Sequence, residues 1–188
     1  MTNSSSLLRK SIVTNLCALV MLLLLISCDN NSPLMDAAMS GEMDDVKSLL
    51  NQTSDINAKN SYGWTALIQA TRNNHVEVVR FLLDNGADIN SQSKTGWSAL
   101  MMAAMKGSEA SLDELLKRGA DIELADETGW TAVLWAVNRD ERKILQKLID
   151  AGPNLEVKPI DGRTPAIMAR REGHPEIGDI LKKAGVKF

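Results

Sequence analysis

The chain has 188 residues, of which 44% are hydrophobic, 24% charged and 4% aromatic, and its formal net charge is -3. This length fits one domain of ordinary size, and the apolar fraction is too high for an intrinsically disordered protein. Acidic residues outnumber basic ones by 24 to 21, which disfavours a nucleic-acid-binding protein, and two cysteines are too few for a disulfide scaffold.

Residues 1–27 have the composition of a secretory signal peptide. Their charged side chains are Arg9 and Lys10, and no acidic residue is present. An apolar stretch follows, without a polar side chain from Ala18 to Ile26. It is short for a bilayer span, which needs ~20 mostly apolar residues. We therefore expect these residues to direct the export of the rest of the chain.

The segment ends in Leu25-Ile26-Ser27-Cys28, which resembles the cleavage motif of bacterial lipoprotein signal peptides. In that family the cysteine carries lipid on its thiol and becomes the new amino terminus. The resemblance implies that Cys28 is lipidated and that residues 28–32 form a tether. The acyl chains of such a lipid hold a protein at a membrane, since each buried CH₂ group contributes ~0.8 kcal/mol. The alternatives are an uncleaved N-terminal helix anchor and an ordinary signal peptidase site.

Asp29 follows the expected lipidated cysteine directly. This position resembles the signal that keeps lipoproteins at the inner membrane of enteric bacteria. It implies a location on the periplasmic face of the inner membrane, with the outer membrane as the alternative. Removal of residues 1–27, with their two basic side chains, changes the net charge from -3 to -5.

The exported part repeats itself every 33 residues. The period is marked by four glycines, each followed by a similar sequence: Gly63-Trp-Thr-Ala-Leu, Gly96-Trp-Ser-Ala-Leu, Gly129-Trp-Thr-Ala-Val and Gly162-Arg-Thr-Pro-Ala. A second landmark, Gly-Ala-Asp-Ile-Asn at Gly86, recurs in altered form at Gly119 and Gly152. The 33-residue period and the residues at the repeated positions resemble the ankyrin repeat, in which a turn and two antiparallel helices form one unit.

The resemblance implies an all-α solenoid of about five helix-turn-helix units with short β-hairpin loops. The units are expected at about 33–59, 60–92, 93–125, 126–158 and 159–188, which together form one domain, 33–188. No unit can bury its apolar face alone, so neighbouring units must stack.

Individual residues fit this arrangement. Hydroxyl side chains are placed to cap the first helices, namely Thr65, Ser98, Thr131 and Thr164. Glycines with positive φ are expected to end the second helices, namely Gly86, Gly119 and Gly152. Small side chains on the first helices allow close stacking, namely Ala70, Ala103, Ala136 and Ala169.

Motifs for catalysis and metal binding are missing from the sequence. His75 and His174 lie 99 residues apart, which is three repeat periods, so they occupy equivalent positions too distant to cooperate. The family often places a hydrogen-bonding histidine there. No phosphate-binding loop, zinc-ligand spacing or serine-nucleophile motif occurs. We expect no catalytic residue, metal, cofactor, small-molecule substrate or nucleic-acid partner.

Ankyrin arrays bind proteins through their hairpin tips and the concave face of their first helices, so the resemblance implies a protein partner. Tryptophan follows three hairpin glycines, a usually exposed position in the family, where stacking would align the rings ~10 Å apart as a ladder. Trp135 is expected near one end of it. The predicted partner-binding residues are Tyr62, Trp64, Trp97, Met102, Met105, Trp130, Trp135 and Arg163. Alternatively, the indoles pack on one another as a structural spine.

Two functions remain open for such a membrane-anchored periplasmic protein. The first is a scaffold or helper for a resident envelope protein. The second is an inhibitor, such as an immunity protein that neutralises a toxin in the periplasm. Charge along the solenoid runs from -3 over residues 33–62 to +3 over residues 162–188. The basic end is interpreted as a solubilising cap, with contact to an acidic partner as the alternative.

Overall fold

The computed structural model describes residues 30–52 and 55–188. Within these residues all regular secondary structure is helical and no strand occurs. The helices are α2 (Pro33–Ser40), α3 (Met43–Leu50), α4 (Ala66–Arg72), α5 (Val76–Asp84), α6 (Ala99–Lys106), α7 (Glu109–Lys117), α8 (Ala132–Asn138), α9 (Arg142–Asp150), α10 (Pro165–Arg171) and α11 (Pro175–Lys183). The prediction of an all-α repeat fold is confirmed. The predicted signal peptide, Cys28 and Asp29 lie outside the described residues.

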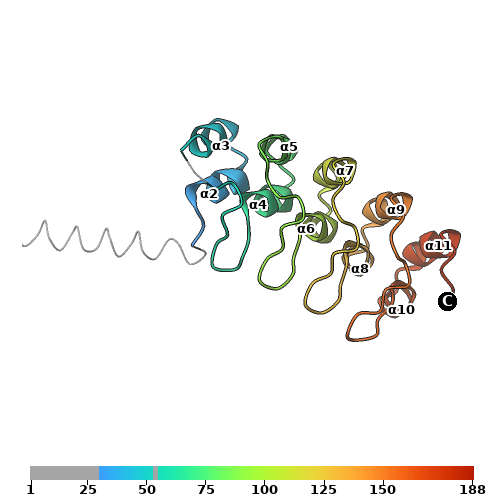
Figure 1. Cartoon of the computed structure of the whole chain (residues 1–188). Helices are drawn as coiled ribbons and strands as arrows, with labels where there is room; N and C mark the ends of the chain where they lie inside the picture. Colours follow the sequence, from blue (N-terminus) through green and yellow to red (C-terminus); the bar gives the residue numbers. More distant parts are fainter. Residues whose placement is uncertain (1–29, 53–54) are drawn as a thin grey trace, which may run out of the picture.

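The helices form consecutive pairs that lie side by side as a solenoid (Figure 1). The first helix of each pair contacts the first helices of its neighbours, and the second helices form a parallel outer row. Long loops project from the first row, away from the second row (Figure 1). None of the helices that the structure describes is long and apolar enough to cross a bilayer.

Hydroxyl side chains cap most of the first helices as predicted. The Oγ atoms of Thr65, Ser98 and Thr164 accept hydrogen bonds from backbone amides three residues later, at 3.3, 3.2 and 3.4 Å. Thr131 occupies the same position before α8 but makes no such bond, and its buried Oγ1 has no partner. The repeat therefore specifies where each first helix begins, although one cap is incomplete.

Glycines at the two landmarks serve different purposes. Gly86, Gly119 and Gly152 have φ between 78° and 88°, as predicted for the ends of second helices, and a Cβ there would meet nothing within 4 Å. At Gly63 and Gly96 φ is also positive, but a Cβ would lie 2.5 and 2.7 Å from the backbone of the next loop. These two positions exclude a side chain because successive loops pack directly on one another.

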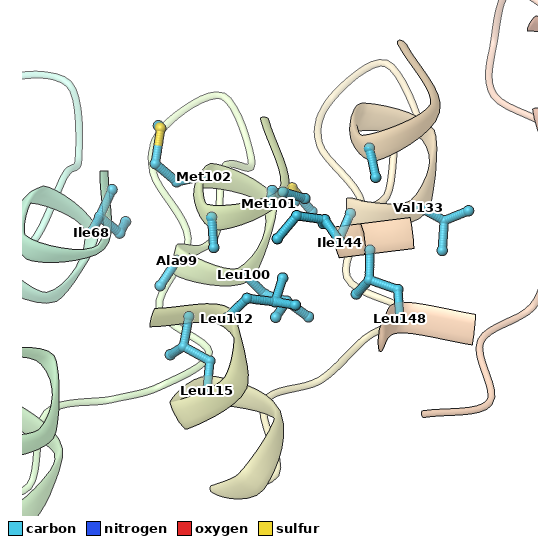
Figure 2. Packing of buried hydrophobic residues seen from close by; sticks show 14 of the residues in the cluster. Ile68, Ala99, Leu100, Met101, Met102, Leu112, Leu115, Val133, Ile144 and Leu148 are labelled. Carbon is cyan, nitrogen blue, oxygen red and sulfur yellow. The ribbon is translucent and has the colours of Figure 1, made fainter. Parts of the chain in front are cut away.

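Small and aliphatic side chains fill the space between the helix pairs. The alanines at the shared position of α4, α6, α8 and α10 are at most 3% exposed. At the third position of the first helices, Ile68, Met101 and Leu134 are fully buried, whereas Ile167 on α10, the last first-row helix, is 38% exposed. Figure 2 shows part of this core around the third and fourth pairs. Each pair thus depends on its neighbours to bury its apolar face.

A chain of hydrogen bonds links the loops that follow the second helices. Asn57 Oδ1 accepts from the amide of Asp88 at 2.8 Å, and Asn90 Oδ1 accepts from the amide of Asp121 at 2.9 Å. Glu123 Oε1 repeats this contact with the amide of Asn154 at 2.7 Å. The landmark Asp-Ile-Asn and its variants therefore join the first four units to one another.

Ion pairs connect neighbouring second helices. On α7, the buried Glu114 accepts from Arg118 Nε at 2.8 Å and from Arg80 Nε of α5 at 3.4 Å. The hydrogen bond from Arg118 is the largest cause that lowers the pKa of Glu114. At the next junction the signs are reversed, since Asp113 of α7 pairs with Lys147 of α9 at 2.7 Å.

Glu114→Gln is expected to lower the Tm by about 2–4 °C at pH 7 because a buried carboxylate loses its ion pairs with two partly exposed arginines. A carboxyl whose pKa is lower in the folded than in the unfolded state stabilises the fold fully at a pH above its unfolded-state pKa. This contribution is lost as the pH falls through the folded-state pKa. The difference from wild type should therefore shrink below about pH 4.3, the ordinary pKa of glutamate. Thermal unfolding between pH 3 and 7 measures it, with the exposed Asp179→Asn as control. An equal difference at every pH would contradict the prediction.

Candidate protein-binding site

The loops before α4, α6 and α8 are each closed by one polar side chain. Asn60 Oδ1, Ser93 Oγ and Asp126 Oδ1 accept hydrogen bonds from the backbone amides four residues later, at 2.9, 3.0 and 3.0 Å. These loops, residues 60–64, 93–97 and 126–130, are called the hairpin loops with their equivalent 159–163. The sequence analysis missed these acceptors, although they recur three residues before the hairpin glycines.

The hairpin loops also bond to one another through the backbone. Lys94 N donates to the carbonyl of Tyr62 at 3.0 Å, and Glu127 N donates to that of Thr95 at 3.1 Å. Ile160 N continues the series to the fourth loop, at 3.0 Å from the carbonyl oxygen of Thr128. In that loop the closing position is Pro159, which has neither an amide hydrogen nor a polar side chain to supply. The hairpin loops therefore form one continuous face, with its least regular member at the C-terminal end.

Three of the four tryptophans form a compact cluster on this face. The ring of Trp135 lies 4.5 Å from that of Trp97 and 4.6 Å from that of Trp130, measured between centroids. The Trp135 Nε1–H donates to Asp126 Oδ2 at 3.2 Å, so Asp126 holds both its own loop and the central ring. We call these three residues the tryptophan cluster.

The cluster differs from the evenly spaced ladder that the sequence predicted. Trp135 was expected near one end, but it contacts both Trp97 and Trp130. The ring comes from helix α8 rather than from a hairpin loop, which is why the period of the loops did not predict its place. Trp64 takes no part in the cluster's ring contacts and instead lies under Arg72, whose Cζ is 5.2 Å from the ring centroid. The contacts of the Trp135 ring with the rings of Trp97 and Trp130 support the structural-spine alternative for the cluster.

Exposure separates the predicted binding residues into two groups. Trp130 is 6% and Met102 2% exposed, so the expectation that they lie on the surface is wrong. Trp130 is covered by Trp135 and Arg163, and Met102 lies within α6 in the core between units. Tyr62 is 54% exposed. The remaining predicted residues are half-buried, namely Trp64, Trp97, Met105, Trp135 and Arg163.

A groove of about 450 Å³ lies over the tryptophan cluster. Its other walls are Thr95, Thr128, Asp126, Glu127, Asp161 and Arg163. The guanidinium carbon of Arg163 lies 5.2 Å from the centroid of the Trp130 ring, and its Nη2 pairs with Asp161 Oδ2 at 2.6 Å. A hydrogen bond from Arg163 lowers the pKa of the Asp161 carboxyl. Arg163, predicted to bind a partner, is thus held by neighbours inside the groove.

His75 makes a hydrogen bond to the preceding unit, as the family resemblance implied, whereas the contact of His174 with Asp140 is longer than a hydrogen bond. His75 begins α5, and its Nε2 lies 3.0 Å from the carbonyl oxygen of Met39 in the preceding unit. His174 holds the equivalent position before α11, with Nδ1 3.9 Å from Asp140 Oδ1. Among the residues that the structure describes, no group of three or more His, Cys, Asp or Glu side chains is arranged to hold a metal ion.

Comparison with known proteins identifies the repeat. A family model described as ankyrin repeats (3 copies) matches residues 11–93, 85–158 and 100–188. These overlapping matches include all the helices of the solenoid. A comparison with the curated proteins gave no match.

Trp135→Phe tests the role of Asp126 in joining the cluster to its loop. The change keeps an aromatic ring but leaves the buried Asp126 Oδ2 without its indole donor, which should lower the free energy of unfolding by about 1–3 kcal/mol. Urea unfolding of the full chain measures this loss. Trp97→Phe is the matched control, because its ring belongs to the same cluster while its side chain makes no contact with Asp126 of this kind. Equal losses in both variants would argue against the Asp126 contact.

Proposed function

Because the chain belongs to the ankyrin repeat family, whose members act as protein-protein interaction modules, we propose that it binds a protein partner while lipid on Cys28 anchors it at a bacterial membrane. In this proposal the protein is a scaffold or helper for another envelope protein. The observation that supports the binding role is the continuous face of hairpin loops, which presents aromatic side chains next to the packed hydrophobic core.

Two properties of this face suit it to binding. The first is rigidity, since backbone bonds from Lys94, Glu127 and Ile160 fix successive loops before any partner arrives. A preformed surface loses less conformational entropy on binding. The second is chemistry, since Tyr62 is exposed and Trp97 half-buried next to a groove. Tyrosine and tryptophan are common anchors of protein interfaces.

The residues that follow the proposed anchor in the sequence, Asn31 and Ser32, are bonded to the folded body. Ser32 caps α2 through a hydrogen bond from Met35 N to its Oγ at 3.3 Å, and Asn31 Oδ1 accepts from Asn60 Nδ2 at 2.7 Å. The chain is therefore fixed to the solenoid from Asn31 onward. Lipid on Cys28 would leave a free tether of about 10 Å, taking ~3.3–3.6 Å per extended residue. Such a tether would hold the first unit at the membrane surface.

Cys28→Ser tests the anchor. We expect the variant to move from the membrane fraction to the soluble or precursor fraction, because no acyl chain can then be attached. Cys17→Ser is the matched control, since it removes the other cysteine and should leave the distribution unchanged. Cell fractionation with immunoblotting measures both. A Cys28→Ser protein that stays in the membrane with the wild-type size would refute lipidation at this residue.

Tyr62→Ala tests the binding face. With the full chain as bait in detergent-solubilised envelope, the variant should capture its partner about tenfold less strongly, as expected for an interface anchor. Its Tm should stay within a few degrees, because Tyr62 is 54% exposed. Phe188→Ala is the control, an aromatic that is 46% exposed at the other end of the chain. Equal capture by both variants would contradict the proposal.

The identity of the captured protein separates the two forms of the proposal. A resident envelope protein would support the scaffold or helper role. A secreted toxin whose activity is blocked by the complex would replace it with the inhibitor role of an immunity protein. Both use the same rigid face, so the choice between them depends on the partner.

A further inference from the structure

The groove over the tryptophan cluster combines an aromatic floor with excess negative charge. Its lining contributes three carboxylates, from Asp126, Glu127 and Asp161, against one cation, Arg163. Trp97 and Trp135 are half-buried, and both line the groove. An aromatic surface bordered by carboxylates attracts cations, because both the electron-rich ring faces and the negative carboxylates attract positive charge.

The groove already contains one cation of known chemistry. The Arg163 guanidinium lies over the Trp130 ring at 5.2 Å and pairs with Asp161 at its edge. A guanidinium over an indole ring recurs at the first hairpin loop, where the Cζ of Arg72 lies 5.2 Å from the Trp64 ring centroid. Indole rings of this face are therefore suited to a planar guanidinium, which can stack and donate to a carboxylate at the same time.

The remaining carboxylates of the groove differ in their availability. Both oxygens of Asp126 are engaged, Oδ1 by the amides of its own loop and Oδ2 by Trp135. Asp161 is paired with Arg163. Glu127 is exposed, and its carboxylate forms no ion pair with any cation of residues 30–52 or 55–188. Its backbone is fixed, since Glu127 N donates to the carbonyl of Thr95. The groove lining therefore includes one carboxylate without an ion-pair partner among these residues, on a backbone position that is fixed.

The ring spacing distinguishes between kinds of cation. Centroid separations of 4.5 and 4.6 Å mean that the cluster's rings touch, so no gap between them can enclose a compact ammonium group. A cation must instead lie on top of the rings. A flat guanidinium makes the larger contact with such a platform and retains donors for a carboxylate at the side.

We propose that the groove binds an arginine side chain of the protein partner, stacked on Trp97 and Trp135 and paired with Glu127. This inference rests on the proposed function and specifies the partner, which must present an exposed arginine. Arg163 serves as the groove's own guanidinium and fixes the Trp130 end of the platform. The excess of carboxylates provides the charge complementarity that selects a basic segment over an acidic one.

The test uses the full chain in detergent and three peptides, acetyl-Gly-Gly-X-Gly-Gly-amide with X as arginine, lysine or glutamine. Titration is followed by tryptophan fluorescence, since three of the four tryptophans form the platform. The arginine peptide should bind with a Kd in the millimolar range and several-fold more tightly than the lysine peptide. The glutamine peptide should show no saturable change. Higher salt should weaken the binding of the arginine peptide.

Glu127→Gln should weaken arginine binding by about threefold or more, as expected when a cation loses its charged partner. Glu172→Gln removes the same charge from an exposed residue outside the groove and should have no effect. Trp97→Phe should retain most of the binding, because a ring remains on the platform, whereas Trp97→Leu should lose it. Circular dichroism confirms that each variant is folded.

Several results would overturn the inference. Equal binding of the three peptides would exclude arginine selectivity, and equal affinities of the Glu127→Gln and Glu172→Gln proteins would exclude the carboxylate. If Glu127→Gln still captures the envelope partner at wild-type strength, the groove is not the point of contact, while the proposed function stands. If the wild-type chain captures no partner through the hairpin loops, the proposed function fails, and the inference fails with it.

Discussion

The stacking of one helix pair on the next is the constraint on which the rest of the structure depends. Each pair has an apolar stripe that only its neighbours can cover, so the alanines of the first helices, such as Ala103 and Ala136, are fully buried. The same contact continues into the loops, where Gly63 and Gly96 leave no room for a Cβ. Because the pairs must approach this closely, the hairpin loops bond to one another and become a rigid face.

Asp126 connects this structural constraint to the candidate site. One of its oxygens closes a hairpin loop, as Asn60 and Ser93 do in theirs, and the other holds the Trp135 ring between Trp97 and Trp130. The tryptophans therefore stabilise the loops and also form the floor of the groove. In the proposed function, the spine and the binding surface, which the sequence analysis treated as alternatives, are two sides of one cluster. Buried Trp130 belongs to the first, and the accessible parts of Trp97 and Trp135 are available to the second.

The repeat period predicted the backbone features well and the side-chain packing less well. Helix starts, the glycines with positive φ and the buried alanines follow from landmarks that recur every 33 residues. Trp135 could not be placed in this way, because the equivalent positions hold Gln69, Met102 and Met168 and so show no period in residue type. The exposure of Met102 was also misjudged. Its side chain is buried in the core between units, although no repeat in residue type marks this position. The loop-closing acceptors were overlooked because three residue types, Asn60, Ser93 and Asp126, make the same hydrogen bond. Their position therefore shows no repeat in residue type.

Site-specific photo-crosslinking of the full chain in cells tests most directly that the hairpin loops are the binding face. The repeat supplies matched positions: Tyr62, Thr95 and Thr128 are exposed on the hairpin loops, while Asp84, Lys117 and Asp150 are exposed at the ends of the second helices. A crosslinker placed at the three loop positions should trap one common partner, and at the three helix positions it should trap none. The same partner trapped from the second helices and not from the loops would contradict the assignment of the binding face.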